Sequence, residues 1–210
     1  MFITFEGIEG SGKSLQIARA QEYLRQSKGI ACLVTREPGG TDFGLALRSV
    51  LLGIHGYRME PWSELLLYLA DRYQHLKEII EPALKRRLVV LSDRYQAATR
   101  AYQGAARGIP IAEIEELNCL LGIIEPDRTI LLDLDPEQGL ARARARNIAS
   151  GSAAAEGRFE AEDLEFHRKV REAYLELAAK SHQRISVVPA SGSPDEVATR
   201  IARLLDQWIV

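Results

Sequence analysis

Hydrophobic positions in this chain fall into two alternating kinds of segment. Short apolar runs rich in β-branched residues predict five strands, at Phe2–Glu6, Ile30–Thr35, Leu88–Asp93, Arg128–Asp133 and Ile185–Val188. Between them, apolar residues recur every three or four positions, which predicts helices at Ser14–Gln26, Ser63–Leu84, Ile111–Leu121, Leu164–Ala179 and Asp195–Trp208. Strands this apolar, alternating with helices, indicate a parallel sheet covered on both faces. The 210 residues contain no repeat or linker, so we expect one α/β domain over residues 1–210.

Composition and charge narrow the class of protein. A formal net charge of -2 gives no sign of a surface that holds nucleic-acid polymers, and the apolar runs are too short to span a membrane. Cys32 and Cys119 have no partner pattern, which favours reduced thiols over a metal site or disulfide framework. The N-terminal run Met1–Glu6 lacks the basic region of a signal peptide. We therefore expect a cytoplasmic protein that binds neither membranes nor nucleic-acid polymers.

A phosphate-binding loop follows the first predicted strand. Residues 7–14 (GIEGSGKS) match the pattern G-x-x-x-x-G-K-[ST], with a strand before them and a helix after them. Glycines let the backbone N–H groups converge on phosphate oxygens at the helix N-terminus. Lys13 can bridge the β- and γ-phosphates, and the Ser14 hydroxyl can ligate Mg²⁺. The expected nucleoside triphosphate site consists of Gly7, Ile8, Glu9, Gly10, Ser11, Gly12, Lys13 and Ser14.

Side chains suited to a phosphorylated acceptor follow the next two strands. Arg36 ends the second strand, and Asp93 and Arg94 end the third. Ligands of parallel sheets bind beyond the carboxyl ends of the strands, so these residues should share one pocket. Either guanidinium could grip a phosphate, while Asp93 could reach Mg²⁺ directly or through water. Taken singly, Arg36 could instead pair with a surface acid, and Asp93 and Arg94 could form a structural salt bridge.

A base-binding surface is predicted on the long second helix. Tyr68 and Arg72 lie four residues apart and therefore share a face. An aromatic ring beside a guanidinium can stack on a base and hydrogen-bond to its edge, although Tyr68 could also belong to the core. Glu9 lies inside the phosphate loop, where a carboxylate would repel phosphate. It could point to the surface, or it could face the acceptor and accept a hydrogen bond from a sugar hydroxyl.

The stretch Asn147–Gly157 (NIASGSAAAEG) is small, polar and flanked by arginines. Its composition is typical of a loose surface loop. The alternative is a mobile lid that closes over phosphates.

Taken together, these motifs resemble the bacterial thymidylate kinases over nearly the whole chain. The matching strings are FEGIEGSGKS (5–14), TREPGGT (35–41), LLLYLADRYQH (65–75), SDRYQAATRAYQG (92–104), LLDLDPEQGLARARAR (131–146), RFE (158–160) and YLELA (174–178). The resemblance implies a P-loop nucleoside monophosphate kinase that phosphorylates dTMP to dTDP with ATP and Mg²⁺ in dTTP biosynthesis. It also implies a three-layer P-loop kinase fold, in which helices flank a five-stranded parallel sheet and a flexible lid spans about residues 142–159. A homodimer and a cis bond before Pro38 are further implications.

The same resemblance implies roles for the acceptor residues. It assigns Glu9 to the deoxyribose hydroxyl, and Arg36 and Arg94 to the dTMP phosphate. It places Tyr102 against the sugar, where the ring obstructs a 2′-hydroxyl. Three residues would contact thymine: Tyr68 by stacking, and Arg72 and Thr99 at the edge of the base.

The donor side resembles one branch of the family. Gly10 stands where some members have an arginine within the phosphate loop, whereas members of the other branch supply positive charge from the lid. Arg146 and Arg158 flank the flexible stretch here, with Arg142 and Arg144 just before it. The expected catalytic residues are accordingly Lys13, Arg94, Arg146 and Arg158. The chain departs from the family at Ala98, where serine is common, and at Gly157, where aspartate often precedes Arg158.

Two other functions compete with this one. The first is a P-loop kinase for another nucleoside monophosphate or for a deoxynucleoside. The second is a nucleotide-dependent switch without an acceptor. A GTP-reading switch would carry an N-K-x-D motif, which the sequence lacks, and it would leave TREPGGT without a use.

Overall fold

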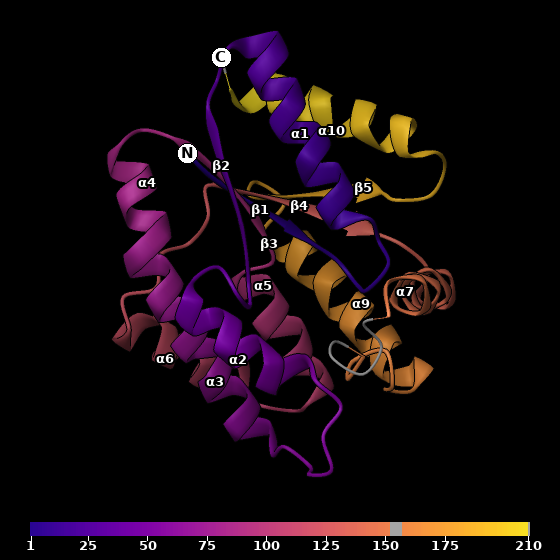
Figure 1. The fold of residues 1–210 in the computed structure, drawn as a ribbon. Helices are drawn as coiled ribbons and strands as arrows, with labels where there is room; N and C mark the ends of the chain where they lie inside the picture. Colours follow the sequence, from indigo (N-terminus) through magenta and orange to yellow (C-terminus); the bar gives the residue numbers. More distant parts are fainter. Residues whose placement is uncertain (152–156, 210) are drawn as a thin grey trace.

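A computed structural model describes residues 1–151 and 157–209 of the chain. Its five strands form one parallel sheet in the order β2-β3-β1-β4-β5 (Figure 1). The strands are β1 (Phe2–Glu6), β2 (Cys32–Arg36), β3 (Val89–Asp93), β4 (Arg128–Asp133) and β5 (Ile185–Pro189). Each lies within two residues of its predicted bounds. The central strand β1 is buried along its whole length, as expected for a sheet covered on both faces.

Helices cover both faces of the sheet and make the three layers (Figure 1). On one face, α1 (Lys13–Lys28) packs beside α10 (Pro194–Trp208). On the other face, α9 (Leu164–Lys180) packs against β4 and β5, and α4 (Glu81–Lys85) packs against β3. The main core lies between these layers and includes Phe5, Ile17, Leu24 and Val170. The predicted fold class is confirmed.

The long predicted helix Ser63–Leu84 is a continuous helical rod in three parts. These are α3 (Pro61–His75), the π-helical turn η1 (Leu76–Ile80) and α4. The remaining elements are α2 (Asp42–Leu52), α5 (Gln96–Thr99), the π-helical η2 (Arg100–Ala106), α6 (Ile111–Leu120) and α7 (Pro136–Ser150). Helix α2 packs on α3, and η2 packs on α9. Helix α2 follows β2, and α5 and η2 follow β3, so these three elements come after the carboxyl ends of those strands, where ligands of parallel sheets bind.

The structure differs from the prediction at the start of the polar stretch Asn147–Gly157. Helix α7 continues through Ser150 and ends at Gly151, whose φ of 67° is left-handed. Asn147 is buried, and Arg144 and Arg146 bind Glu160, so this end of the helix is held against another segment where the sequence indicated flexibility. Residues 152–156, the middle of the predicted lid, lie outside the described residues. Within the two described ranges, no helix combines the length and the hydrophobicity needed to cross a membrane.

Candidate active site

The phosphate loop wraps around its own lysine. Gly7, Gly10 and Gly12 have φ values of 135°, 70° and 91°, which residues with a side chain rarely adopt. Helix α1 begins at Lys13, whose Nζ donates to the carbonyl oxygens of Gly7 at 3.0 Å and Ile8 at 2.9 Å. Burial, together with the charge of Arg94, lowers the pKa of Lys13 to about 8. An anion that binds at the N-terminus of α1 would therefore contact a preformed loop and the Lys13 ammonium group.

Two glycines bring the phosphate loop into backbone contact with α7. A Cβ atom on Gly10 would lie 2.0 Å from the carbonyl oxygen of Gly139. A Cβ atom on Gly139 would lie 2.6 Å from the carbonyl oxygen of Glu9. Both separations are far below an ordinary van der Waals contact. The packing thus excludes an arginine at position 10 and explains in physical terms why this chain has glycine there.

Ser14 and Asp93 form an oxygen pair beside Lys13. The Ser14 hydroxyl donates to Asp93 Oδ2 at 2.8 Å, which joins the start of α1 to the end of β3. Hydroxyl and carboxylate oxygens suit Mg²⁺, which usually takes few protein ligands and completes its shell with phosphates and water. The described residues contain no group of three or more His, Cys, Asp or Glu side chains that could hold a metal alone. This pair therefore fits an ion that arrives with a nucleotide.

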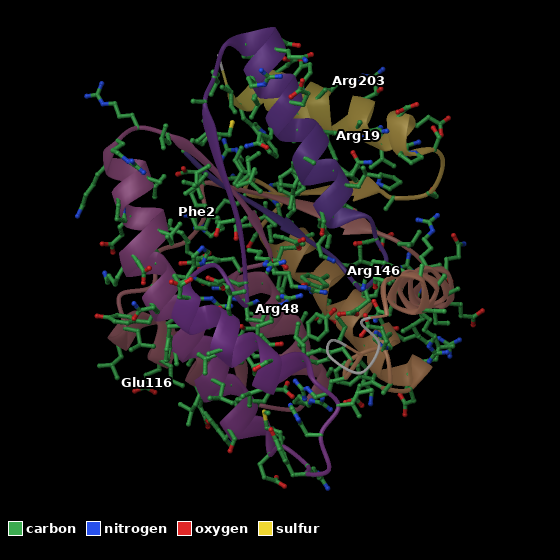
Figure 2. All side chains as sticks on the ribbon, in the orientation of Figure 1. Phe2, Arg19, Arg48, Glu116, Arg146 and Arg203 are labelled. Atoms are coloured by element: carbon green, nitrogen blue, oxygen red, sulfur yellow. The ribbon has the colours of Figure 1, made fainter. Side chains whose placement is uncertain are left out.

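A cavity of about 420 Å³ opens beyond the carboxyl ends of β1, β2 and β3. This volume lies within the range of small-molecule sites. Arg48 of α2 and Arg146 of α7 both line it, and Figure 2 labels these two arginines. The predicted residues that line it are Glu9, Gly10, Gly12, Lys13, Ser14, Arg36, Tyr68, Arg72, Asp93, Arg94, Thr99, Tyr102 and Arg146. The structure therefore brings together most of the residues that the sequence predicted.

Glu9 faces this cavity and is held by two neighbours. Its Oε1 accepts hydrogen bonds from Arg94 Nη2 at 2.8 Å and from the Tyr102 hydroxyl at 2.6 Å. Burial opposes ionisation of Glu9, but Arg94, His167, Lys13 and Tyr102 outweigh it and hold the pKa of Glu9 below its ordinary value. Glu9 is therefore an anion that can accept a hydrogen bond. Arg94 pairs with Glu9 while Asp93 bonds to Ser14, so the structure supports no Asp93–Arg94 salt bridge.

The wall around Arg72 and Thr99 contains unpaired polar atoms. Arg72 Nε donates to Glu37 Oε2 at 2.8 Å, and Nη2 donates to the carbonyl oxygen of Tyr95 at 3.0 Å. Arg72 Nη1 and Thr99 Oγ1 are also buried, yet neither has a hydrogen-bond partner among the described residues. Buried polar atoms are usually paired. Both residues line the cavity beside Tyr68, which makes these two atoms candidates for pairing with a polar edge of a ligand.

The other acceptor residues lie at the rim of this wall or support it. Arg36 is exposed at the end of β2 and lines the cavity. Ala98, one of the two residues that depart from the family pattern, also lines the cavity. The peptide bond between Glu37 and Pro38 is cis, as the resemblance implied. Arg48 was not among the predicted site residues, and it donates to the carbonyl oxygen of Pro38 at 2.9 Å. A basic residue a few positions after TREPGGT is the one signal in the sequence that could have drawn attention to it.

The two arginines that flank the predicted lid occupy different places. Arg146 lines the cavity, is largely exposed, and forms an ion pair with Glu160 at 3.2 Å. Arg158 is not among the described residues that line the cavity. Its guanidinium is bound to buried Glu64 of α3 at 2.6 Å and to the carbonyl oxygen of Leu51. Arg158 therefore lies away from the donor side in this structure, contrary to the expectation that both arginines face the phosphates.

Comparisons with known proteins agree on one family. The family model described as thymidylate kinase matches residues 5–201. The chain is 50% identical to the thymidylate kinase of Nitratidesulfovibrio vulgaris (strain Miyazaki F), with 97% of this chain and 94% of the relative covered. It is 51% identical to that of Syntrophotalea carbinolica, with 95% and 92% covered. Among solved structures, the thymidylate kinase from Ehrlichia chaffeensis aligns with a TM-score of 0.78 at 32% identity, covering 98% of both chains.

Proposed function

Because the chain belongs to the thymidylate kinase family and phosphorylates dTMP, we propose that the 420 Å³ cavity binds dTMP beside ATP. The acceptor would lie along α3 and η2, and the triphosphate would lie on the phosphate loop. The two groups then meet between Lys13, at the start of α1, and Arg94, just after β3, which both line the cavity.

The unpaired atoms of Arg72 and Thr99 carry this proposal. Thymine presents carbonyl oxygens that accept hydrogen bonds, whereas cytosine presents an amino donor where thymine has O4. Arg72 Nη1 can donate to such a carbonyl and cannot pair with the amino group. The Thr99 hydroxyl can pair with the neighbouring edge of the base, while the half-buried ring of Tyr68 supplies a stacking surface. A base that leaves these atoms unpaired is strongly disfavoured.

Phosphoryl transfer depends on positioning and neutralising charge. Arg36 and Arg94 would hold the acceptor phosphate in line with the γ-phosphorus of ATP. Glu9 would accept a hydrogen bond from the sugar hydroxyl, and the Tyr102 ring would obstruct a 2′-hydroxyl. No strong general base is required, since a phosphate acceptor is ionised near neutral pH. Closure over the cavity would exclude water, which competes as a nucleophile.

The donor side would be neutralised by cations of the protein and by a metal ion. Ser14 and Asp93 would hold Mg²⁺, which would neutralise part of the negative charge of the ATP phosphates. Lys13 would bridge the β- and γ-phosphates. Arg146 would add positive charge from α7, because the contact between Gly10 and Gly139 leaves no room for an arginine in the loop itself.

A homodimer in the cytoplasm is part of the same proposal. Large apolar side chains on α2 and α3 are exposed in the single chain, which supports their burial against a second copy. They are Phe43, Trp62, Leu66 and Tyr73. Free Cys32 and Cys119 fit a reducing compartment.

Thr99→Val tests the acceptor assignment because it removes the hydroxyl and keeps the shape of the side chain. We expect the KM for dTMP to rise about tenfold, the effect of one lost hydrogen bond in a closed site, while the KM for ATP stays constant. Thr199→Val on exposed α10 is the matched control. Equal changes in both KM values, or no change in either, would contradict the assignment of Thr99 to thymine.

A further inference from the structure

Glu6 is a buried carboxylate behind the cavity to which the proposed function gives no role. It is the last residue of β1 and is 0% exposed. Its Oε1 accepts the backbone N–H of Tyr95 at 2.8 Å, and its Oε2 accepts the hydroxyl of Tyr174 at 2.8 Å. Burial raises the pKa of Glu6 to about 7, against the opposing effects of Arg94, Tyr174, the Tyr95 N–H and Lys13. Burying a carboxylate is unfavourable unless hydrogen bonds compensate for the lost water. The two groups that Glu6 binds, the N–H of Tyr95 and the hydroxyl of Tyr174, therefore indicate its role.

Arg94 has a backbone conformation that needs support. Its φ of 72° lies in the left-handed region, which is unfavourable for a residue with a side chain. Its own N–H donates to the carbonyl oxygen of Phe5 at 2.9 Å, and the Ser92 hydroxyl donates to the Arg94 carbonyl oxygen at 2.9 Å. The following N–H, that of Tyr95, is the group bound by Glu6. Glu6 therefore fixes the peptide on the carboxyl side of this strained residue.

Tyr174 links Glu6 to the guanidinium of Arg94. The Tyr174 hydroxyl, on α9, donates to Glu6 and accepts from Arg94 Nη1 at 3.3 Å. A hydroxyl has one proton, so donating it to Glu6 leaves the lone pairs of the oxygen to face Arg94. The other terminal nitrogen, Nη2, is held by Glu9. The guanidinium is thus fixed between two carboxylates, one in direct contact and one acting through Tyr174.

We propose that Glu6 is a positioning residue for the acceptor: it holds Arg94 in its left-handed backbone conformation and, through Tyr174, aims the guanidinium at the acceptor phosphate. This inference rests on the proposed role of Arg94 in binding dTMP. Glu6 itself touches no substrate, since it lies outside the described residues that line the cavity. Small displacements of such a group matter, because a misplacement of about 1 Å can lower the rate of an enzyme about 100-fold.

The test uses Glu6→Gln, Tyr174→Phe and the double variant, with Arg94→Lys as the reference. The glutamine substitution removes the negative charge and can turn an amide N–H donor toward Tyr174, while the phenylalanine substitution removes the link and keeps the aromatic ring. Each single variant should raise the KM for dTMP about tenfold and leave the KM for ATP within about twofold. Glu6 and Tyr174 act on Arg94 through one chain of contacts, so the KM for dTMP of the double variant should not exceed that of the more affected single variant. Tyr23→Phe is the matched control: its hydroxyl also donates to a carboxylate, that of Asp206 at 2.7 Å, but this pair joins α1 to α10 and Tyr23 is not among the described residues that line the cavity.

Three results would overturn the proposal. An unchanged KM for dTMP in both single variants, with a raised KM in Arg94→Lys, would show that Glu6 does not position Arg94. Equal rises in the KM values for dTMP and ATP would show a general structural role. An unchanged KM for dTMP in Arg94→Lys would refute the proposed role of Arg94 itself, and this inference with it. If Glu6→Gln fails to fold, Tyr174→Phe alone decides, because its ring still fills the core.

Discussion

Gly139→Ala should damage nucleotide binding even though it favours the helix in which it lies. Gly139 is in the first half of α7. Replacing a glycine inside a helix with alanine usually stabilises the helix by about 1 kcal/mol. Here, however, the new Cβ atom would lie 2.6 Å from the carbonyl oxygen of Glu9 and 2.8 Å from Ile8 Cδ1. The isoleucine side chain can turn aside, whereas the carbonyl belongs to the backbone of the phosphate loop.

The size of the effect follows from these distances. An ordinary contact begins near 3.4 Å, so either the loop or α7 must move by the difference from 2.6 Å, about 0.8 Å. Displacements of about 1 Å in a catalytic site can lower rates about 100-fold. We expect kcat/KM for ATP to fall by about 10- to 100-fold, equivalent to about 1.4 to 2.7 kcal/mol. The melting temperature should change little, because the gain in helix propensity offsets the strain.

Steady-state kinetics with ATP varied, together with thermal melting, test this prediction. Gly56→Ala is the matched control, because a Cβ atom there would have no neighbour within 4 Å among the described residues. That variant should keep wild-type kcat/KM for ATP. A Gly139→Ala enzyme with wild-type kcat/KM and a raised melting temperature would refute the reasoning. It would mean that α7 does not constrain the phosphate loop.

Further predictions concern charged groups. Arg146→Ala should lower kcat about 10³-fold with little change in the KM for dTMP, and wild-type kcat in this variant would contradict the donor-side role of Arg146. Arg158→Ala should mainly lower the melting temperature, because it loses the contact with Glu64. The affinity for ATP, measured by calorimetry, should fall by up to about tenfold per pH unit above about pH 8. Buried Lys13 has a pKa of about 8 and loses its proton, and with it its positive charge, in that range. An affinity that does not change with pH would contradict this. Glu37→Gln should lower the free energy of unfolding, measured in urea, by about 3 kcal/mol, because it leaves the buried charge of Arg72 without a counterion. An unchanged urea concentration at the midpoint of unfolding would contradict this.

The sequence predicted the sheet well because strand signals are local. Each apolar run matched one strand within two residues, and the phosphate loop lay between a strand and a helix as expected. Helix α2 was not predicted, because TREPGGT reads as a turn and gives no sign that the Thr41 side chain caps a helix by accepting from the N–H of Gly44. Likewise, the small and polar residues of Asn147–Ser150 predicted a loop. In the structure they continue α7, in which Asn147 is buried and Arg144 and Arg146 bind the distant residue Glu160.

Most of the candidate site was predicted, and the rest depends on contacts between distant segments. The strings that carry Glu9, Arg94 and Tyr102 could be recognised, and the structure joins these three side chains directly. Nothing in the sequence indicated that Tyr174 would link Glu6 to the same guanidinium, since they are 168 residues apart. The contact of Arg158 was missed for a similar reason. Its neighbours in sequence indicated a lid, while its partner, Glu64 of α3, lies 94 residues away in the sequence.

The rate of ADP formation with a panel of acceptors tests the central claim most directly. Purified enzyme with ATP and Mg²⁺ would be offered dTMP, dUMP, dCMP, UMP and GMP at equal concentrations. We expect dTMP to be the best acceptor and dUMP a weaker one, and dCMP to be poor, because cytosine presents an amino group where thymine presents a carbonyl oxygen that can accept from Arg72 Nη1. We expect no activity with GMP, whose two-ring base is larger than thymine, and little with UMP, because we propose that the Tyr102 ring obstructs its 2′-hydroxyl. Faster turnover of dCMP, UMP or GMP than of dTMP would contradict the account.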